Sequence, residues 1–207
     1  MRQLKVLQRP EAIARRVREL GRQISKDFAG QTLDVVGVLN NGYVFMADLV
    51  RALSVPVRVH FVRTEIIDTT DPSTGKERKE IFYSPEIEAA DRNILLVRGV
   101  VQSGVTTEFL LRRIGLHNPR AVKLAICVDK PDERKLFLEA DYYAFRAASN
   151  TLVVGYGLAW NGSHGSLPYL GAWADRQRGS RPARRRRPAK AARRRGKVRA
   201  KSRARRK

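Results

Sequence analysis

The stretch from Asn93 to Leu111, NILLVRGVVQSGVTTEFLL, limits what this chain can fold into more than any other. It opens with the short apolar run Ile94–Val97, whose length and β-branched character are typical of a fully buried strand. Arg98, Gly99, Gln102, Ser103 and Gly104 then interrupt the apolar pattern, and from Val105 onward apolar residues recur at helical spacing. The pattern predicts a buried strand, a tight turn and a helix.

A helix N-terminus that directly follows a small-residue turn is a natural site for an anion. Its first backbone N–H groups have no partner within the helix, and the helix dipole favours negative charge. Here the turn consists of Gln102, Ser103, Gly104, Val105 and Thr106, which supply two hydroxyls and a glycine that allows close approach. Serine–glycine turns also serve as simple helix caps, so the motif alone leaves a purely structural interpretation open.

Strand and helix patterns alternate along the rest of the first 175 residues, which favours an α/β fold with a Rossmann-like, mostly parallel sheet. Helical patterns cover 10–30 and the residues around 45–53, and strand patterns cover 32–39, 55–62, 80–82, 122–128, 142–145 and 152–154. The polar, turn-rich stretch 68–79 predicts a mobile loop.

Ligands of parallel α/β sheets bind at the carboxyl ends of the strands. Three segments directly follow predicted strands: Asn40–Gly42, Arg98–Thr106 and Asp129–Pro131. We expect them to line one crevice.

The cysteine and histidine content argues against a disulfide framework and a metal site. The single cysteine, Cys127, lies in an apolar run, which is typical of a buried thiol in a reducing compartment. The three histidines have no metal-ligand spacing with it, so no metal site is predicted. The chain shows neither a signal peptide nor a membrane-spanning run, so we expect a cytoplasmic protein without a membrane partner.

The net charge of +22 is concentrated at the C-terminus. Between Arg176 and Lys207 there are 18 Lys and Arg residues and no acid. Without an apolar face, this segment is predicted to be disordered, so we divide the chain into a domain, 1–175, and a basic tail, 176–207. Such tails bind phosphate backbones without reading bases, which predicts a nucleic-acid partner, DNA in the first place, and association with the nucleoid. A solubilising or localising extension is the alternative.

The nucleic-acid contacts predicted for the tail are its basic residues from Arg184 onward. They are Arg184, Arg185, Arg186, Arg187, Lys190, Arg193, Arg194, Arg195, Lys197, Arg199, Lys201, Arg203, Arg205, Arg206 and Lys207.

Four separated motifs carry a family resemblance: LGRQI at 20–24, GVLNNGYVFMADLVRAL at 37–53, VDKP at 128–131, and VVGYGL with LPYLG between 153 and 171. Together with VRGVVQSGVTT they resemble the hypoxanthine/guanine branch of the type I phosphoribosyltransferases. The resemblance implies the fold of that family, including its small hood region, and assembly as a homodimer or homotetramer.

The resemblance also implies roles for particular residues. Ser103, Gly104 and Thr106 match the loop that holds the 5′-phosphate of the nucleotide. Lys130 matches the lysine that contacts the exocyclic oxygen of the purine, and Val153 matches a residue whose backbone meets the base.

Other positions depart from the family pattern. Arg98 and Gly99 replace the acidic pair that holds the ribose hydroxyls and the metal, Gln102 replaces the general acid/base, and Ala159 replaces a metal-binding aspartate. Four more departures are Gly165 for an arginine that meets diphosphate, Leu152 for the aromatic that stacks on the base, and Ile66 and Ile67 for the Ser-Tyr pair of the mobile loop. An amide cannot exchange a proton at neutral pH, and magnesium needs oxygen ligands.

These departures predict a catalytically inactive member of the family, without a cofactor, that binds nucleic acid through its tail. The alternative is an active purine phosphoribosyltransferase that uses phosphoribosyl diphosphate and Mg²⁺. A third hypothesis is a sensor, in which the retained phosphate cradle binds a purine nucleotide and adjusts what the tail does.

Overall fold

The computed structural model describes residues 4–70, 77–84 and 88–173, with only the backbone given for 65–70 and 77–84. Within these residues the larger sheet has six strands in the order β4-β3-β2-β5-β6-β7. All its strand pairs are parallel except β3 with β4. The strands are β2 (Leu33–Leu39), β3 (Val57–Thr70), β4 (Glu77–Ser84), β5 (Asn93–Val101), β6 (Ala121–Asp129) and β7 (Tyr142–Arg146).

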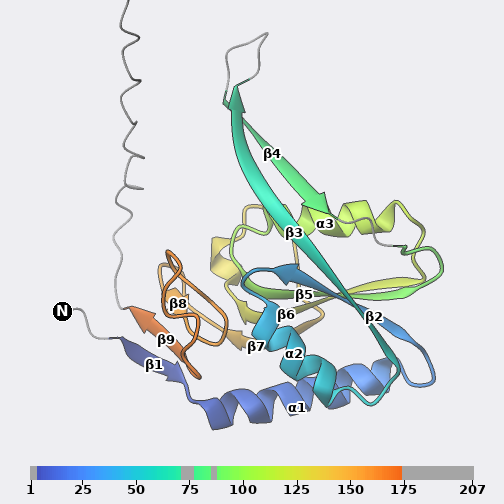
Figure 1. The fold of residues 1–207 in the computed structure, drawn as a ribbon, viewed down its shortest axis with the longest axis horizontal. Coiled ribbons are helices and arrows are strands. Elements are labelled where there is room, and N and C mark those ends of the chain that lie inside the picture. Colours follow the sequence, from blue (N-terminus) through green and yellow to red (C-terminus); the bar gives the residue numbers. More distant parts are fainter. Residues whose placement is uncertain (1–3, 71–76, 85–87, 174–207) are drawn as a thin grey trace, which may run out of the picture. The chain divides into compact units, whose positions relative to one another are not determined.

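Alternation along β5 explains why this sheet has helices on both faces. Successive residues of a strand point to opposite faces. Leu95 and Val97 join the apolar cluster that contains residues of α1 (Pro10–Asp27) and α2 (Tyr43–Ala52). Ile94 and Leu96 join the cluster that contains residues of α3 (Val105–Gly115). The result is the three-layer arrangement visible in Figure 1, with α1 and α2 on one face and α3 on the other.

The pattern of α1 shows how the sequence directs this packing. Pro10 supplies the fixed φ suited to the first turn of a helix. Ile13, Val17, Leu20 and Ile24 recur every three or four residues and are all buried. Burying one such side chain contributes roughly 1.5–3 kcal/mol, so this face holds the helix against the sheet.

A second, three-stranded antiparallel sheet has the order β1-β9-β8. It joins the N-terminal strand β1 (Lys5–Gln8) to β8 (Leu152–Val154) and β9 (Leu170–Trp173) near the end of the described residues. The predicted strand at 152–154 is confirmed, whereas β1 and β9 were not anticipated. Lys5–Gln8 has a mostly exposed surface, so it carries little of the hydrophobic signal on which strand prediction depends.

Two sequence predictions need correction. The stretch 68–79 is not wholly a loop, because β3 continues to Thr70 and β4 begins at Glu77. The two polar segments form strands because their backbones pair in register from Arg63↔Ser84 to Thr70↔Glu77. Arg98 and Gly99 do not lie in a turn either, because β5 runs to Val101 and remains paired with β6.

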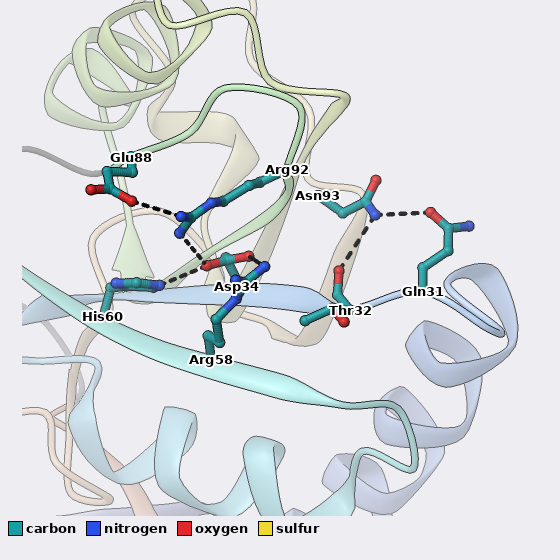
Figure 2. A network of polar contacts seen from close by, with 8 residues as sticks. All are labelled: Gln31, Thr32, Asp34, Arg58, His60, Glu88, Arg92 and Asn93. Atoms are coloured by element: carbon teal, nitrogen blue, oxygen red, sulfur yellow. Dashed lines mark hydrogen bonds and ion pairs between the residues drawn. The ribbon is translucent and has the colours of Figure 1, made fainter.

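Asp34, near the amino end of β2, is the centre of a polar network (Figure 2). Its side chain is fully buried and accepts contacts from three cationic or titratable groups. His60 Nε2 lies 2.7 Å from Oδ1, Arg92 Nη1 lies 3.3 Å from Oδ1, and Arg58 Nη2 lies 3.2 Å from Oδ2. Arg92 also reaches Glu88 Oε2 at 2.7 Å. The charge of the buried carboxylate is therefore balanced by ion pairs, although its Oδ2 meets Arg58 only as an ion pair and accepts no hydrogen bond in the described residues.

Candidate functional site

A pocket of about 430 Å³ lies where β2 and β5 end. Its walls come from the segments after these strands, from β3 and from the start of α3. The lining residues are Val38, Leu39, Asn40, Asn41, Arg63, Thr64, Arg98, Gly99, Val100, Gln102 and Thr106. The prediction that Asn40–Gly42 and Arg98–Thr106 share a crevice is thus confirmed for these two segments.

The third predicted segment, Asp129–Pro131, does not contribute to the pocket lining. Asp129 and Lys130 are buried, and each is paired with a neighbour that follows in the chain. Arg134 Nη2 donates to Asp129 Oδ1, and Lys130 Nζ lies 2.6 Å from Glu133 Oε1. Local ion pairs therefore occupy the charged side chains of this segment.

The turn before α3 has the geometry of an open helix N-terminus. Gly104 adopts the left-handed conformation, with φ of 82°, which glycine adopts at no steric cost. No side chain caps the helix, so its first N–H groups are left for water or a ligand. Gln102 and Thr106 line the pocket, whereas Ser103, Gly104 and Val105 do not.

Hydrogen bonds from the segment after β6 stabilise the turn before α3. Lys135 N donates to Ser103 O at 3.0 Å, and Lys130 N donates to Val101 O at 3.1 Å. Arg134 Nη1 adds bonds to the carbonyl oxygens of Val101 at 2.9 Å and Gln102 at 2.6 Å. The loop after β6 thus supports the loop after β5.

Arg98 brings a cation into the pocket. Residue 98 is half-buried, but its Nε is shielded from solvent and has no hydrogen-bond partner in the described part of the chain. Burial lowers the pKa of the guanidinium to about 10, because desolvation disfavours the charged form. The group still carries its charge at neutral pH.

Gly99 is where the chain packs most tightly beside the pocket. A Cβ at this position would overlap the Asn41 carbonyl oxygen and lie 2.5 Å from its carbonyl carbon. Carbon atoms pack best about 3.5–4.0 Å apart. A carboxylate side chain at position 99 would therefore require the loop after β2 to move.

The remaining predicted site residues lie elsewhere. Val153 and Leu152 belong to β8 in the small sheet, and neither lines the pocket. Ala159 is exposed, and a Cβ at Gly165 would lie 3.2 Å from its Cβ. Ile66 and Ile67 lie in β3, opposite Ile81 and Glu80 of β4, within the backbone-only segment. The tail residues from Arg184 to Lys207 lie outside the described residues.

The pocket does not fit a magnesium ion held by the protein. Its lining contains two arginines and no carboxylate. Among the residues that the structure describes, no group of three or more His, Cys, Asp or Glu side chains could hold a metal. Mg²⁺ requires oxygen ligands at close range, and carboxylates are its usual protein ligands.

Four lining residues were missed by sequence reasoning: Val38 and Leu39 at the end of β2, and Arg63 and Thr64, for which the reason is instructive. Arg63 and Thr64 both lie on β3, beyond the point where the predicted strand ended. Arg63 pairs in register with Leu39, the last residue of β2. If the predicted strand at 55–62 had been extended to match the length of the strand at 32–39, Arg63 would have been placed beside Leu39 at the carboxyl end of the sheet. The paired register of the two strands was therefore the signal that could have revealed Arg63.

Comparison with known proteins identifies the family. Residues 3–159 match the family described as phosphoribosyl transferase domain. The chain belongs to this family. The predicted resemblance and the predicted α/β fold are both confirmed, because this match extends over most of the chain and structural neighbours share the arrangement.

Three relatives illustrate the match of this phosphoribosyl transferase domain. The hypoxanthine-guanine phosphoribosyltransferase of Mycobacterium avium is 32% identical over 172 residues, covering 80% of this chain and 83% of that protein. The crystal structure of a hypoxanthine-guanine phosphoribosyltransferase from Bacillus anthracis str. 'Ames Ancestor' is 30% identical with a TM-score of 0.71, covering 83% of this chain and 99% of the other. The bifunctional protein TilS/HprT of Listeria innocua is 32% identical over 169 residues. That match covers 81% of this chain but only 25% of the bifunctional protein.

These relatives correct the main functional prediction. A catalytically inactive, nucleic-acid-binding protein was expected, but the relatives are named as phosphoribosyltransferases and none of these names concerns DNA. They favour the alternative, an active enzyme. The error came from treating the replaced acids as decisive, although the phosphate turn, the pocket and most of the fold are retained. The pocket also contains an arginine where the family pattern has an acid, so its charge was altered rather than removed.

Other predictions are settled only in part. In the described part of the chain, no helix is long and apolar enough to cross a membrane. The division at residue 175 and the behaviour of the basic tail stay predictions. Association with the nucleoid finds no support among the relatives.

Proposed function

We propose that this chain is a purine phosphoribosyltransferase. It transfers the 5-phosphoribosyl group from phosphoribosyl diphosphate to a purine such as hypoxanthine or guanine. A bond forms between a purine ring nitrogen and C1′ of the ribose, while the bond from C1′ to the diphosphate oxygen breaks. Diphosphate leaves with the electron pair, and the proton of the purine nitrogen passes to solvent.

The observation that carries this proposal is the uncapped N-terminus of α3 at the edge of the pocket. Free N–H groups and a helix dipole favour a phosphate there, and the Thr106 hydroxyl lines the adjacent wall. The same arrangement follows the central strand of a parallel sheet, where ligands of such folds bind. We assign the 5′-phosphate to the turn formed by Gln102–Thr106.

We assign the purine to Lys130 and Val153 on the strength of the family pattern, although neither residue lines the pocket described above. Lys130 directly follows β6, and its backbone N–H is bonded to the end of β5 at Val101. Its ammonium now contacts Glu133, so a base would have to compete with that carboxylate for one of its three N–H groups. This competition would tune affinity for the oxygen of the purine.

A coupled assay tests the proposal. The full chain is incubated with phosphoribosyl diphosphate and with hypoxanthine, guanine or xanthine in turn, in magnesium-containing buffer. We expect sustained formation of nucleoside monophosphate and diphosphate in equal amounts, dependent on both substrates. The absence of nucleotide with all three bases, in protein shown to be folded by circular dichroism, contradicts the proposal.

Two threonine variants locate the phosphate site. Thr106→Val removes a hydroxyl from the pocket wall, and we expect kcat/KM to fall roughly 10- to 100-fold, since hydrogen bonds to charged groups contribute about 1.5–3 kcal/mol. Thr107→Val makes the same chemical change at a buried neighbour that does not line the pocket. Equal losses in both variants would show that the effect is structural.

The family resemblance also supports assembly as a homodimer or homotetramer. Light scattering coupled to size-exclusion chromatography measures the mass in solution. A mass of about 23 kDa, equal to one 23.4 kDa chain, would contradict this part of the proposal.

A further inference from the structure

The pocket contains a half-buried arginine, Arg98, for which the described residues provide no anion. We propose that Arg98 binds a phosphate group of the ligand directly, so that diphosphate binds this pocket without a divalent cation. The identity of the ligand as the diphosphate of phosphoribosyl diphosphate rests on the proposed function, whereas the anion site itself does not.

The surroundings of Arg98 support this assignment first. Its Nε is shielded from water yet has no hydrogen-bond partner in the parts of the chain that the structure describes. A buried donor without a partner is costly, and native proteins rarely leave one in that state. Because the side chain lines a pocket, a ligand can provide the missing acceptor.

Two acids at and just after the end of the neighbouring strand β6 are already engaged. Asp129 closes β6, which pairs with β5, but its carboxylate is bound by Arg134. Glu133 is bound by the buried Lys130. Neither carboxylate lines the pocket, so neither of them neutralises the charge of Arg98 there.

The rest of the lining presents groups that suit an anion. Arg63 supplies a second cationic side chain. Asn40, Asn41 and Gln102 carry amides, and Thr64 and Thr106 carry hydroxyls, all of which can donate hydrogen bonds. No Asp or Glu interrupts this surface. The volume of about 430 Å³ falls within the range of small-molecule sites, roughly 300–1,000 Å³.

Arginine is suited to this role, and position 99 excludes the alternative. The guanidinium presents its donors in a planar fork that matches phosphate oxygens in pairs. An acid at Gly99, which could help to hold a metal, would overlap the backbone of Asn41. The site is therefore built to meet the negative charge of diphosphate with a fixed cation in place of a protein-bound metal.

Isothermal titration calorimetry of the full chain with inorganic diphosphate tests the inference. One series contains EDTA and the other contains MgCl₂. We expect the Kd in EDTA to equal the Kd with magnesium within about threefold, or to be tighter. Binding that appears only with magnesium would overturn the inference, even if the enzyme turns over.

Substitutions at position 98 test the residue itself. Arg98→Met removes the charge at similar length, and we expect the Kd for diphosphate in EDTA to rise roughly 10- to 100-fold. Arg98→Lys keeps the charge but loses the fork, so an intermediate Kd is expected. Arg120→Met is the matched control, because Arg120 is exposed, lies outside the pocket and gives the same change in net charge. Equal weakening by Arg98→Met and Arg120→Met would overturn the assignment.

A second ligand separates the phosphate sources. Inosine monophosphate carries a 5′-phosphate but no diphosphate. We expect Arg98→Met to weaken diphosphate far more than inosine monophosphate, which is assigned to the turn before α3. If Arg98→Met weakened inosine monophosphate more than diphosphate, Arg98 would contact the 5′-phosphate, and its assignment to diphosphate would be overturned. Absence of turnover together with Arg98-dependent binding in EDTA would contradict only the proposed enzyme activity.

Discussion

Two charged side chains lie toward opposite ends of the larger sheet and differ in the partners that the chain provides for them. Asp34, near the start of β2, is fully buried beside Arg58, His60 and Arg92. Arg98, toward the end of β5, has a shielded Nε without a partner in the described residues. Burying a charge is costly unless it is paired. Asp34 has charged partners within the chain, even though its Oδ2 accepts no hydrogen bond, whereas Arg98 has no charged partner in the described residues.

The largest effect is expected at Asp34. Asp34→Asn should lower the free energy of unfolding by about 3–5 kcal/mol, because the buried carboxylate loses its charge and three contacts, each of about 1.5–3 kcal/mol when charge-assisted, weaken together. Urea unfolding monitored by circular dichroism at pH 7 measures the loss. A decrease of less than about 1 kcal/mol would show that the network contributes little to stability, and Asp34 and Arg98 would then not differ in the way described here.

The opposite sign is expected at Arg98. In the absence of phosphate, Arg98→Met should raise the free energy of unfolding by roughly 1–3 kcal/mol, because it removes a buried donor and charge that lack partners. Adding diphosphate should stabilise the unsubstituted chain and not the variant, because a ligand that binds only the folded state stabilises it. Lower stability of Arg98→Met without ligand would show that Arg98 has a structural partner.

The pH dependence sharpens the contrast. The pKa of Arg98 is lowered to about 10 in the folded chain, so the charged group opposes folding at neutral pH. This opposition weakens as the pH rises above that value toward the pKa of the unfolded chain. The stability difference between Arg98→Met and the unsubstituted chain should therefore shrink by about 1 kcal/mol between pH 9 and pH 11. A constant difference would contradict the assigned pKa.

The smallest effect is expected at the outer edge of the Asp34 network. Glu88 pairs with Arg92 at 2.7 Å, but its side chain is 86% exposed. Exposed ion pairs contribute about 0–1 kcal/mol, so Glu88→Gln should change the free energy of unfolding by no more than about 0.5 kcal/mol at pH 7. Urea unfolding in low salt measures it, and a change comparable with that of Asp34→Asn would mean that the network acts as one unit.

Local sequence pattern was sufficient for the centre of the fold. The apolar run at Ile94–Val97 and the helical spacing after Val105 predicted a buried strand and a helix that begins at Val105, as observed. It was not sufficient for β1, β9 or the extension of β3. Those strands are polar or short, and they exist because a distant or adjacent segment supplies their hydrogen bonds. Hydrogen bonding between two such strands leaves little recognisable pattern in the sequence of either strand alone.

The site was predicted to a similar degree. Gln102 and Thr106 were placed at the pocket by the strand–turn–helix pattern, and Arg98 and Gly99 were singled out by comparison with the family motif. Whether a charge is compensated depends on which side chains fold against it. The sequence therefore could not reveal that Asp129 is taken by Arg134 while Arg98 lacks a partner. The inference of inactivity failed at this step, since it counted missing acids without knowing what surrounded the arginine.

The close packing of Gly99 against Asn41 bears on how easily this site could change over time. A single Gly99→Asp substitution would not simply return a carboxylate to the pocket, because the new side chain would collide with the backbone of another loop. The backbone of the loop at Asn40–Gly42 would have to change conformation as well, either before or together with the substitution at residue 99. Placing a carboxylate at this position therefore requires coordinated changes at residue 99 and in the loop after β2. Attempts to engineer a metal site here should begin with the loop after β2 and only then change residue 99.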